Sequence, residues 1–325
     1  MSNSITAPRQ SGIAAFLQLI TLAGVTGLLV WRLAIDRAPA DALGLYWVLV
    51  LAVWLLAWEF NHTVSSGRGA LSRFAGWLAP VLFGLTLLLL WEALCVGFAV
   101  PTVLLPAPSL IGARIAASLP TLWGDFVQTV IRAALPGWII GCGAGFGLAL
   151  VCDRFDFLRR GLMPIGNLVS ALPIIGIAPI LVMWFGFDWQ SKAAVVVVMT
   201  VFPMLVNTVA GLQAAGHLER DLMRSYGASW WRTLTALRLP AAMPFIFNAM
   251  KINATLALIG AIVAEFFGTP VLGMGFRIST EVGRMAIDMV WATIAVAALV
   301  GSGLYGTLVL FERKTTFWHP SWRER

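Results

Sequence analysis

Long apolar runs are the feature that most constrains the fold of this chain. They recur from end to end, so that 59% of the 325 residues are hydrophobic and only 11% are charged. A soluble domain carries about 25% charged residues. A run of about 20 apolar residues can cross a bilayer as a helix, which pairs its own backbone polar groups. The sequence therefore predicts an all-α polytopic membrane protein.

Eight runs are long enough to be candidate transmembrane helices. The first two would form an N-terminal two-span extension with a linker (residues 1–70), because residues 61–75 are polar and contain glycine. The other six would form a second domain (residues 71–325). Between Val100 and Phe126 we expect a short helix on the outer surface. The eight predicted spans are about 12–31, 43–60, 76–99, 129–151, 162–185, 193–213, 240–264 and 288–310.

The basic residues lie between the apolar runs, as loop charges do. The net charge is +7, but no basic cluster follows one face of a segment, so the pattern excludes a nucleic-acid partner. With eight spans, the side that holds both termini carries twice as many lysines and arginines as the other side. Positively charged loops stay in the cytoplasm. We therefore expect both termini, and the loop that contains Arg224, to be cytoplasmic.

The sequence contains none of the motifs that we searched for as signs of catalysis. HExxH, GxSxG and GxxxxGK[ST] are all absent, the three histidines are scattered in predicted loops, and no CxxC occurs. We expect no catalytic residue, no metal and no cofactor on this chain. Any ATP-driven work would need a partner that binds the ATP.

Glycines recur every four residues in the fourth run, "PGWIIGCGAGFGLAL". Gly137, Gly141 and Gly145 would therefore lie on one face of a helix, where another backbone can approach closely. This face would serve either ordinary helix packing or a contact that slides or opens during a conformational cycle.

Two prolines interrupt the fifth run, "LVSALPIIGIAPILVMWFGFD". Pro173 and Pro179 each lack a backbone donor and should bend or break a helix. In a bilayer such a break survives where neighbours or a cavity satisfy the freed carbonyls. The segment should face the protein interior, either as a simple kink or as part of a translocation path.

Three charged residues fall inside predicted spans, where charge is costly and usually has a purpose. Glu92 is the deepest, Glu265 lies near the outer end of its span, and Lys251 lies near the cytoplasmic end. Lys251 could extend its side chain to the cytoplasmic surface. For Glu92 and Glu265 a structural role stands beside a role in the path or its gate.

Residues 224–244 ("RSYGASWWRTLTALRLPAAMP") bring three arginines into this apolar chain. Leu218–Tyr226 suits a short helix, and Gly227 permits the positive φ of a sharp corner. Ser229 suits the N-cap of a second helix, and Pro240 suits the start of a third. One interpretation is an amphipathic helix resting on lipid, with arginines at anionic headgroups. That interpretation does not require the glycine corner or the Leu-Pro that follows.

The stretch resembles the EAA loop of ABC importer permeases. Asp221 falls at the family's glutamate, Gly227 at its glycine and Leu239-Pro240 at its Leu-Pro, while "LM" replaces the two alanines. The resemblance implies a coupling helix that docks on a cytoplasmic ATPase. Tyr226 with Trp230 or Trp231 would bury there, and the arginines would rim the contact. The candidate coupling residues are Asp221, Arg224, Tyr226, Gly227, Ala228, Ser229, Leu239 and Pro240.

The wider resemblance extends over residues 76–315. It includes "LLPAPS", "ALPIIGIAPILVMWFGF", "FPMLVNTVAGL" and "AEFFGTPVLGMG", and looks closest to the nitrate, sulfonate and taurine branch, which includes transporters of thiamine-pyrimidine precursors. It implies an inner-membrane importer subunit that pairs with a second copy and receives solute from a periplasmic binding protein. A secondary transporter or a membrane scaffold are the alternatives. The former would show an internal repeat, which we do not find, and the latter would need no docking loop.

Overall fold

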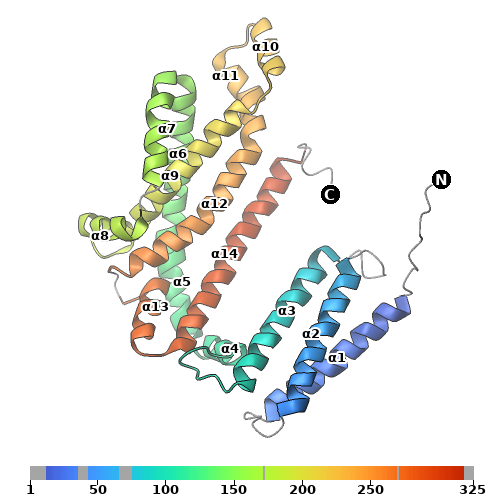
Figure 1. The fold of residues 1–325 in the computed structure, drawn as a ribbon. Helices are drawn as coiled ribbons and strands as arrows, with labels where there is room; N and C mark the ends of the chain where they lie inside the picture. The colour runs from blue at the N-terminus through green and yellow to red at the C-terminus, as the bar shows by residue number, and fades with distance from the viewer. Residues whose placement is uncertain (1–11, 36–42, 66–74, 171–172, 269–270, 318–325) are drawn as a thin grey trace, which may run out of the picture. The chain divides into compact units, whose positions relative to one another are not determined.

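The computed structural model describes residues 12–35, 43–65, 75–170, 173–268 and 271–317. Every regular element within these ranges is helical (Figure 1). The contacts divide the chain into two compact units, Met1–Arg114 and Ile115–Arg325. The predicted domain boundary at residue 70 stays a prediction.

The first unit packs three long helices and leads into a short one. The core lies between the long helices, and Tyr46 there donates a hydrogen bond from its hydroxyl to the Ala93 carbonyl at 2.7 Å. The helices are α1 (Gly12–Ile35), α2 (Leu43–Ser65), α3 (Ala75–Gly97) and the greater part of α4 (Pro108–Ala117), within which the boundary between the units falls.

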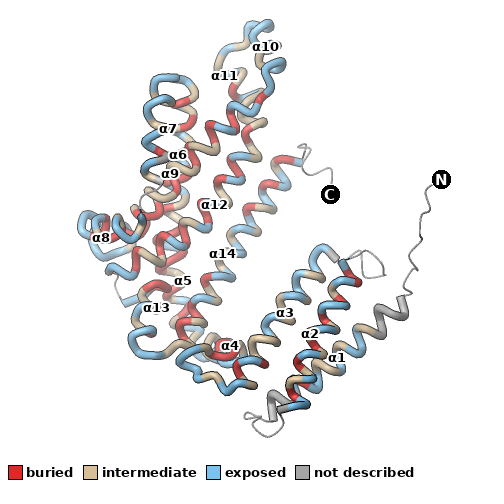
Figure 2. The backbone as a smooth tube through the Cα atoms, viewed as in Figure 1, coloured by how far each residue is buried: buried red, intermediate tan, exposed pale blue. Residues whose placement is uncertain are grey.

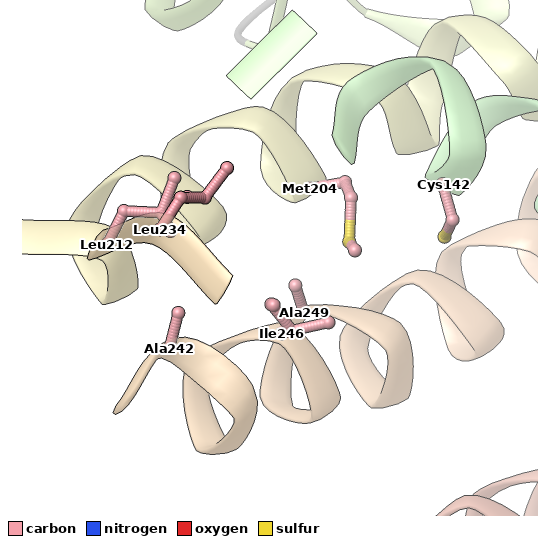
Figure 3. Packing of buried hydrophobic residues seen from close by; sticks show 7 residues of the cluster. All are labelled: Cys142, Met204, Leu212, Leu234, Ala242, Ile246 and Ala249. Carbon is pink, nitrogen blue, oxygen red and sulfur yellow. The ribbon is translucent and has the colours of Figure 1, made fainter. Parts of the chain in front are cut away.

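The second unit is built around α6, α9 and α12, and the buried residues gather along these helices (Figure 2). Figure 3 shows one cluster, in which Met204 of α9 lies between Cys142 of α6 and Ile246 of α12. The helices are α5 (Leu119–Phe126), α6 (Leu135–Arg154), α7 (Asp156–Ser170), α8 (Ile174–Phe185), α9 (Trp189–Gln213), α10 (His217–Ser225), α11 (Trp230–Thr233), α12 (Leu239–Glu265), α13 (Met274–Gly283) and α14 (Ile287–Thr315), with two π-helical segments, η2 (Val127–Ala134) and η3 (Leu234–Arg238).

Six described helices are long and apolar enough to cross a membrane, so the chain is a multi-pass membrane protein. Each overlaps one of the predicted spans, but the first and fifth predicted spans are not among them. The helix α1 is 24 residues long, but its side chains are described only over Gln18–Val30, so the first span stays a prediction. The six helices are Gly44–Ser65, Gly76–Gly97, Leu119–Arg154, Trp189–Gln213, Trp230–Glu265 and Ile287–Thr315.

The fifth predicted span is two helices, α7 and α8, because Pro173 takes an extended backbone (φ −70°, ψ 119°) directly before α8. Pro179, in contrast, lies inside α8 without ending it. The α8 helix packs with the start of α9 and the end of α12 around Ala178 and Ala264, whereas α6 ends beside the start of α12. The α7–α8 pair therefore links the two ends of the second unit as a broken span.

Two predicted boundaries are wrong because helices continue through prolines. We expected a separate helix before Pro240, but Trp230–Glu265 is one continuous helical stretch. Likewise Leu119–Phe126 is the first part of the long helix that contains α6, and only α4 fits the expected short helix. In both stretches a π-helical segment precedes a Leu-Pro pair. Such a bulge accommodates the missing proline donor without ending the helix.

Candidate functional site

The corner after α10 is a Schellman motif with Gly227 at its centre. Gly227 has φ +64°, its amide donates to the Arg224 carbonyl at 2.9 Å, and the Ala228 amide donates to the Met223 carbonyl at 3.0 Å. These bonds satisfy the last carbonyls of α10. The positive φ that the sequence predicted is confirmed. A Cβ at Gly227 would meet no atom within 4 Å, so the constraint is the backbone angle rather than space.

The chain resumes a helix two residues after this corner. Ser229 is the N-cap of α11, and its hydroxyl accepts a hydrogen bond from the Arg232 amide at 3.4 Å, as predicted. Leu239 and Pro240 are the first two residues of α12. Because the helix continues from α11 into α12, the preceding turn must relax to accommodate a proline that has no N–H to donate. The π-helical segment η3 provides that relaxation.

Apolar side chains on the two short helices are exposed. No residue of α10 is buried, and Leu218, Tyr226 and Trp231 are 84%, 79% and 66% exposed. Arg224 pairs with Asp221 at 3.6 Å within α10, and both side chains are largely exposed. We call the exposed set of Leu218, Tyr226, Trp231 and Arg224 the loop surface. Large exposed apolar groups rimmed by charge are typical of protein-binding surfaces.

The two adjacent tryptophans point to different surroundings. Trp230 packs against the buried cluster that contains Leu212 and Leu234, and the Arg154 guanidinium lies 5.7 Å from the centre of its ring. Trp231 is exposed. Trp230 therefore anchors the loop to the second unit, and the sequence, which left both open for partner contact, did not separate their roles.

Arg238 corrects the expectation that every arginine of the stretch would rim a partner contact. It forms hydrogen bonds with both carboxylate oxygens of Asp153, one at 2.8 Å, and its Nε donates to the Leu212 carbonyl at 3.0 Å. Only 14% of the Arg238 side chain and 6% of the Asp153 side chain are exposed. Arg238 therefore fixes the start of α12 to the ends of α6 and α9.

The glycine face of α6 packs against α9. A Cβ at Gly137 would lie 2.6 Å from Val196 Cβ, and at Gly141 or Gly145 it would collide with Thr200 or the Val201 carbonyl. A Cβ at the intervening Gly143 or Gly147 would meet nothing. The predicted close approach of two helices is confirmed, and the helices involved belong to the same chain.

Glu265 lies at the end of the second unit opposite the loop, and it is buried. Thr129 donates to its carboxylate at 2.8 and 3.0 Å, and the Gly275 amide donates at 2.7 Å. Nearby, Asp125 accepts from the Gly273 amide and from Arg277, both at 2.8 Å. The two carboxylates hold the first turn of α13, where a helix favours negative charge. This geometry supports the structural role that the sequence left open.

Asp125 and Arg277 were missed as partners because their sequence separation hides the pairing. The hydrogen bond to Asp125 raises the pKa of the Arg277 guanidinium, which is charged in any case. With Glu265 and α13 they form what we call the far-end network.

The other in-span charges also have partners. Glu92 accepts from the Ser109 hydroxyl at 2.7 Å and from the Ser109 amide at 2.8 Å, at the start of α4. Lys251 does not extend to the surface, because its ammonium bonds Glu312 of α14 at 2.8 Å with both side chains nearly buried. Glu312 was missed because its run of polar neighbours, "ERK", suggested a span end.

The arrangement of these residues suits protein binding and the transmission of movement rather than a chemical reaction. Within the described ranges no cluster of His, Cys, Asp and Glu has the geometry to hold a metal ion. Several polar side chains form helix caps and ion pairs between helices, and on the loop the large apolar side chains of Leu218, Tyr226 and Trp231 are exposed. Such a site can dock a protein and carry its movement into the membrane helices.

Comparison with known proteins identifies the family. The family described as "Binding-protein-dependent transport system inner membrane component" matches residues 140–317. The formylaminopyrimidine transport permease protein ThiX of Halalkalibacterium halodurans is 30% identical over 224 residues, which cover 69% of this chain and 89% of the relative. The riboflavin transport system permease protein RibX of Chloroflexus aurantiacus is 29% identical over 237 residues, 72% of this chain and 88% of the relative.

A third relative is the putative aliphatic sulfonates transport permease protein SsuC of Bacillus subtilis, 26% identical over 249 residues, which cover 76% of this chain and 90% of the relative. These matches extend well beyond the loop to most of the chain. The chain therefore belongs to the binding-protein-dependent transport system inner membrane component family, and it is the permease subunit of an ABC importer.

Proposed function

We propose that this permease is driven by an ATPase on a separate chain that docks on the loop surface. The observation that carries the proposal is the exposure of Tyr226 and Trp231 on a loop whose backbone is fixed by Gly227 and Arg238. A rigid corner that presents aromatic groups to solvent suits a partner with a matching groove. ATP binding by the partners would draw two docked loops together and switch the access of the path.

The two remaining partners are a second copy of the chain and a periplasmic binding protein. Together they would form the translocation path and deliver the solute, with residues 71–325 as the permease domain and 1–70 as the extension. Pro173 and Pro179 stay candidates for the path, since they belong to the broken pair α7–α8. Glu92 stays a candidate as well, although its bonds to Ser109 already give it a structural role.

The solute is a small molecule of the kinds that the relatives' names give. Those relatives are permeases for riboflavin, formylaminopyrimidine, aliphatic sulfonates and taurine. We propose a nitrate-, sulfonate- or taurine-type solute, or a pyrimidine-type solute.

The loop end of the second unit faces the cytoplasm in this proposal, and the protein lies in the bacterial inner membrane with both termini inside. Single cysteines introduced at Ser229 and Arg325 (the latter outside the described residues) test this orientation. The native cysteines Cys95, Cys142 and Cys152 are buried and give little background. An impermeant maleimide should label neither site in intact cells and both in broken cells. Labelling of intact cells at either site contradicts the orientation.

The test of the function is purification of the tagged chain from its own membranes. We expect a nucleotide-binding protein to accompany it and to supply all ATP hydrolysis, while the isolated chain hydrolyses none. A chain that purifies without a partner and supports an ion-driven flux in vesicles would be a secondary transporter. A chain that arrives alone and supports no flux would be a scaffold.

A further inference from the structure

We propose that Arg238 is a positioning residue that passes movement of the loop to α6 and α9 at the same time. The inference rests on the proposed function of the loop as the ATPase-docking site. It concerns a residue that faces away from the docking partner and that a partner would not touch. The juxtaposition of Arg238 with Asp153 and the Leu212 carbonyl carries it.

The partners of Arg238 lie at two helix ends. Leu212 is in the last turn of α9, where carbonyls have no donor within the helix, and Asp153 is in the last turn of α6. A carboxylate near a helix C-terminus is unfavourable, because that end is already partly negative. The positive charge of Arg238 between the two ends offsets both, so it holds α6, α9 and α12 together.

An arginine suits this place because one flat group must reach two partners. Its two terminal nitrogens bond the two carboxylate oxygens of Asp153, and its Nε bonds the Leu212 carbonyl. A lysine offers one ammonium and cannot reproduce that fork. We call these hydrogen bonds of Arg238 with Asp153 and Leu212 the joint. Because it has several bonds in one plane, the joint resists rotation of the three helix ends as well as their separation.

Burial separates this pair from the other ion pair of the loop. Arg238 and Asp153 are 14% and 6% exposed, whereas Arg224 and Asp221 are 84% and 68% exposed. Exposed pairs are screened by water and salt and hold little, while buried pairs keep their geometry. Moreover, the Arg224 pair lies within α10, and the Arg238 pair joins separate helices.

The position of Arg238 in the chain makes the joint necessary. It is the last residue of η3 and directly precedes Leu239-Pro240. A π-helical segment before a proline is a weak point in a helix. Without the joint, a turn of α10 and α11 could be absorbed by bending at η3. With it, the same turn must displace the ends of α6 and α9.

The test compares hydrogen exchange in the complex with its co-purified ATPase, without nucleotide and after trapping with MgATP and vanadate. In the wild type, trapping should change exchange both in the loop and in the last turns of α6 and α9. The double variant Arg238→Met/Asp153→Leu removes the joint without leaving a buried charge unpaired, so it should fold. We expect the double variant to keep its ATPase and to show the wild-type change in exchange in the loop. The change in exchange at the last turns of α6 and α9 should be about tenfold smaller than in the wild type.

Two further variants keep the test decisive if the double variant folds poorly. Arg238→Lys keeps the charge beside Asp153 and should give an intermediate loss of the transmitted change. Arg224→Gln should slow association of the ATPase at low salt but, in the complex that forms, transmit the change fully. A double variant, or an Arg238→Lys variant, that transmits like the wild type overturns the proposal. Absence of an ATPase from the wild-type preparation overturns the proposed function instead.

Discussion

The two ends of the second unit differ in how far their charged side chains and short helices are buried. In the far-end network, Asp125 and Glu265 are 0% and 2% exposed, and each accepts hydrogen bonds from within the chain. At the loop end, α10 has no buried residue, and Tyr226 and Trp231 are exposed. The buried carboxylates of the far end are therefore satisfied within the chain, whereas the exposed aromatic side chains at the loop end are available to a partner.

This difference separates residues that hold the fold from residues that meet a partner. At the loop end Arg238, Trp230 and Leu234 turn inward, and they fix the loop rather than present it. Substitutions at the far end should therefore change stability first. Substitutions on the loop surface should change association with the ATPase and leave stability nearly unaltered.

The largest effect is expected from Asp125→Ala in the far-end network. It would leave the Arg277 guanidinium without its main partner and the Gly273 amide without an acceptor. Removing one member of a buried ion pair costs about 3–5 kcal/mol. Thermal unfolding in detergent should show a strongly lowered transition, whereas the exposed Asp221→Ala should unfold nearly like the wild type. Equal stability of the two variants would remove the distinction between the ends.

A somewhat smaller effect is expected from Gly141→Leu on the packed face of α6. The new side chain would collide with Thr200 of α9, and overpacking of this kind costs about 1–3 kcal/mol or more. Gly143→Leu is the matched control, since a Cβ there meets no neighbour. The yield of monodisperse protein by size exclusion should fall for Gly141→Leu alone. If both variants give the wild-type yield, the face does not hold α6 to α9.

Gly227→Val should act on the partner rather than on the membrane helices. Valine at φ +64° costs roughly 1–2 kcal/mol in backbone strain, although space is free around the Cβ position. Gly227→Asn is the control, because asparagine tolerates this conformation. Both variants should insert normally, and only the valine variant should lose much of its co-purified ATPase. An ATPase retained in full by Gly227→Val would mean that the corner does not aim the loop.

The smallest effect is expected from Arg224→Glu at the rim of the loop surface. The side chain is exposed and paired only with Asp221 in the same helix, so stability should stay unchanged. Rim charges govern the rate and salt dependence of association more than its strength. ATPase binding should therefore slow at low salt and match the wild type at high salt. A loss that persists at high salt would place Arg224 in the centre of the contact.

Local sequence signals predicted the local structure well. Gly227, Ser229 and the four-residue spacing of Gly137, Gly141 and Gly145 depend on neighbours within one or two turns, and the structure confirms each conformation or contact. Most apolar runs became membrane-length helices for the same reason, since length and composition are sufficient to predict them. The ATPase and the second copy of the chain, as partners of these residues, stay predictions.

Signals that depend on distant partners were not readable. Nothing within one turn of Arg238 indicates that it meets Asp153, and nothing near Lys251 indicates Glu312. The fifth predicted span is broken at Pro173, whereas α8 continues through Pro179. The sequence around the two prolines did not predict this difference. The periodicity of a sequence predicts which face of a helix is apolar. Which charged residue of another helix lies against that face is known only from the packed structure.

Photocrosslinking in native membranes tests the docking claim most directly. A benzoylphenylalanine at Tyr226, on the loop surface, is compared with one at Phe187, which is 67% exposed and lies beside the start of α9 at the far end. We predict that Tyr226 crosslinks to a nucleotide-binding protein, identified by mass spectrometry, and that Phe187 does not. A nucleotide-binding protein crosslinked from Phe187, or none crosslinked from Tyr226 in cells that carry the intact complex, would contradict the account.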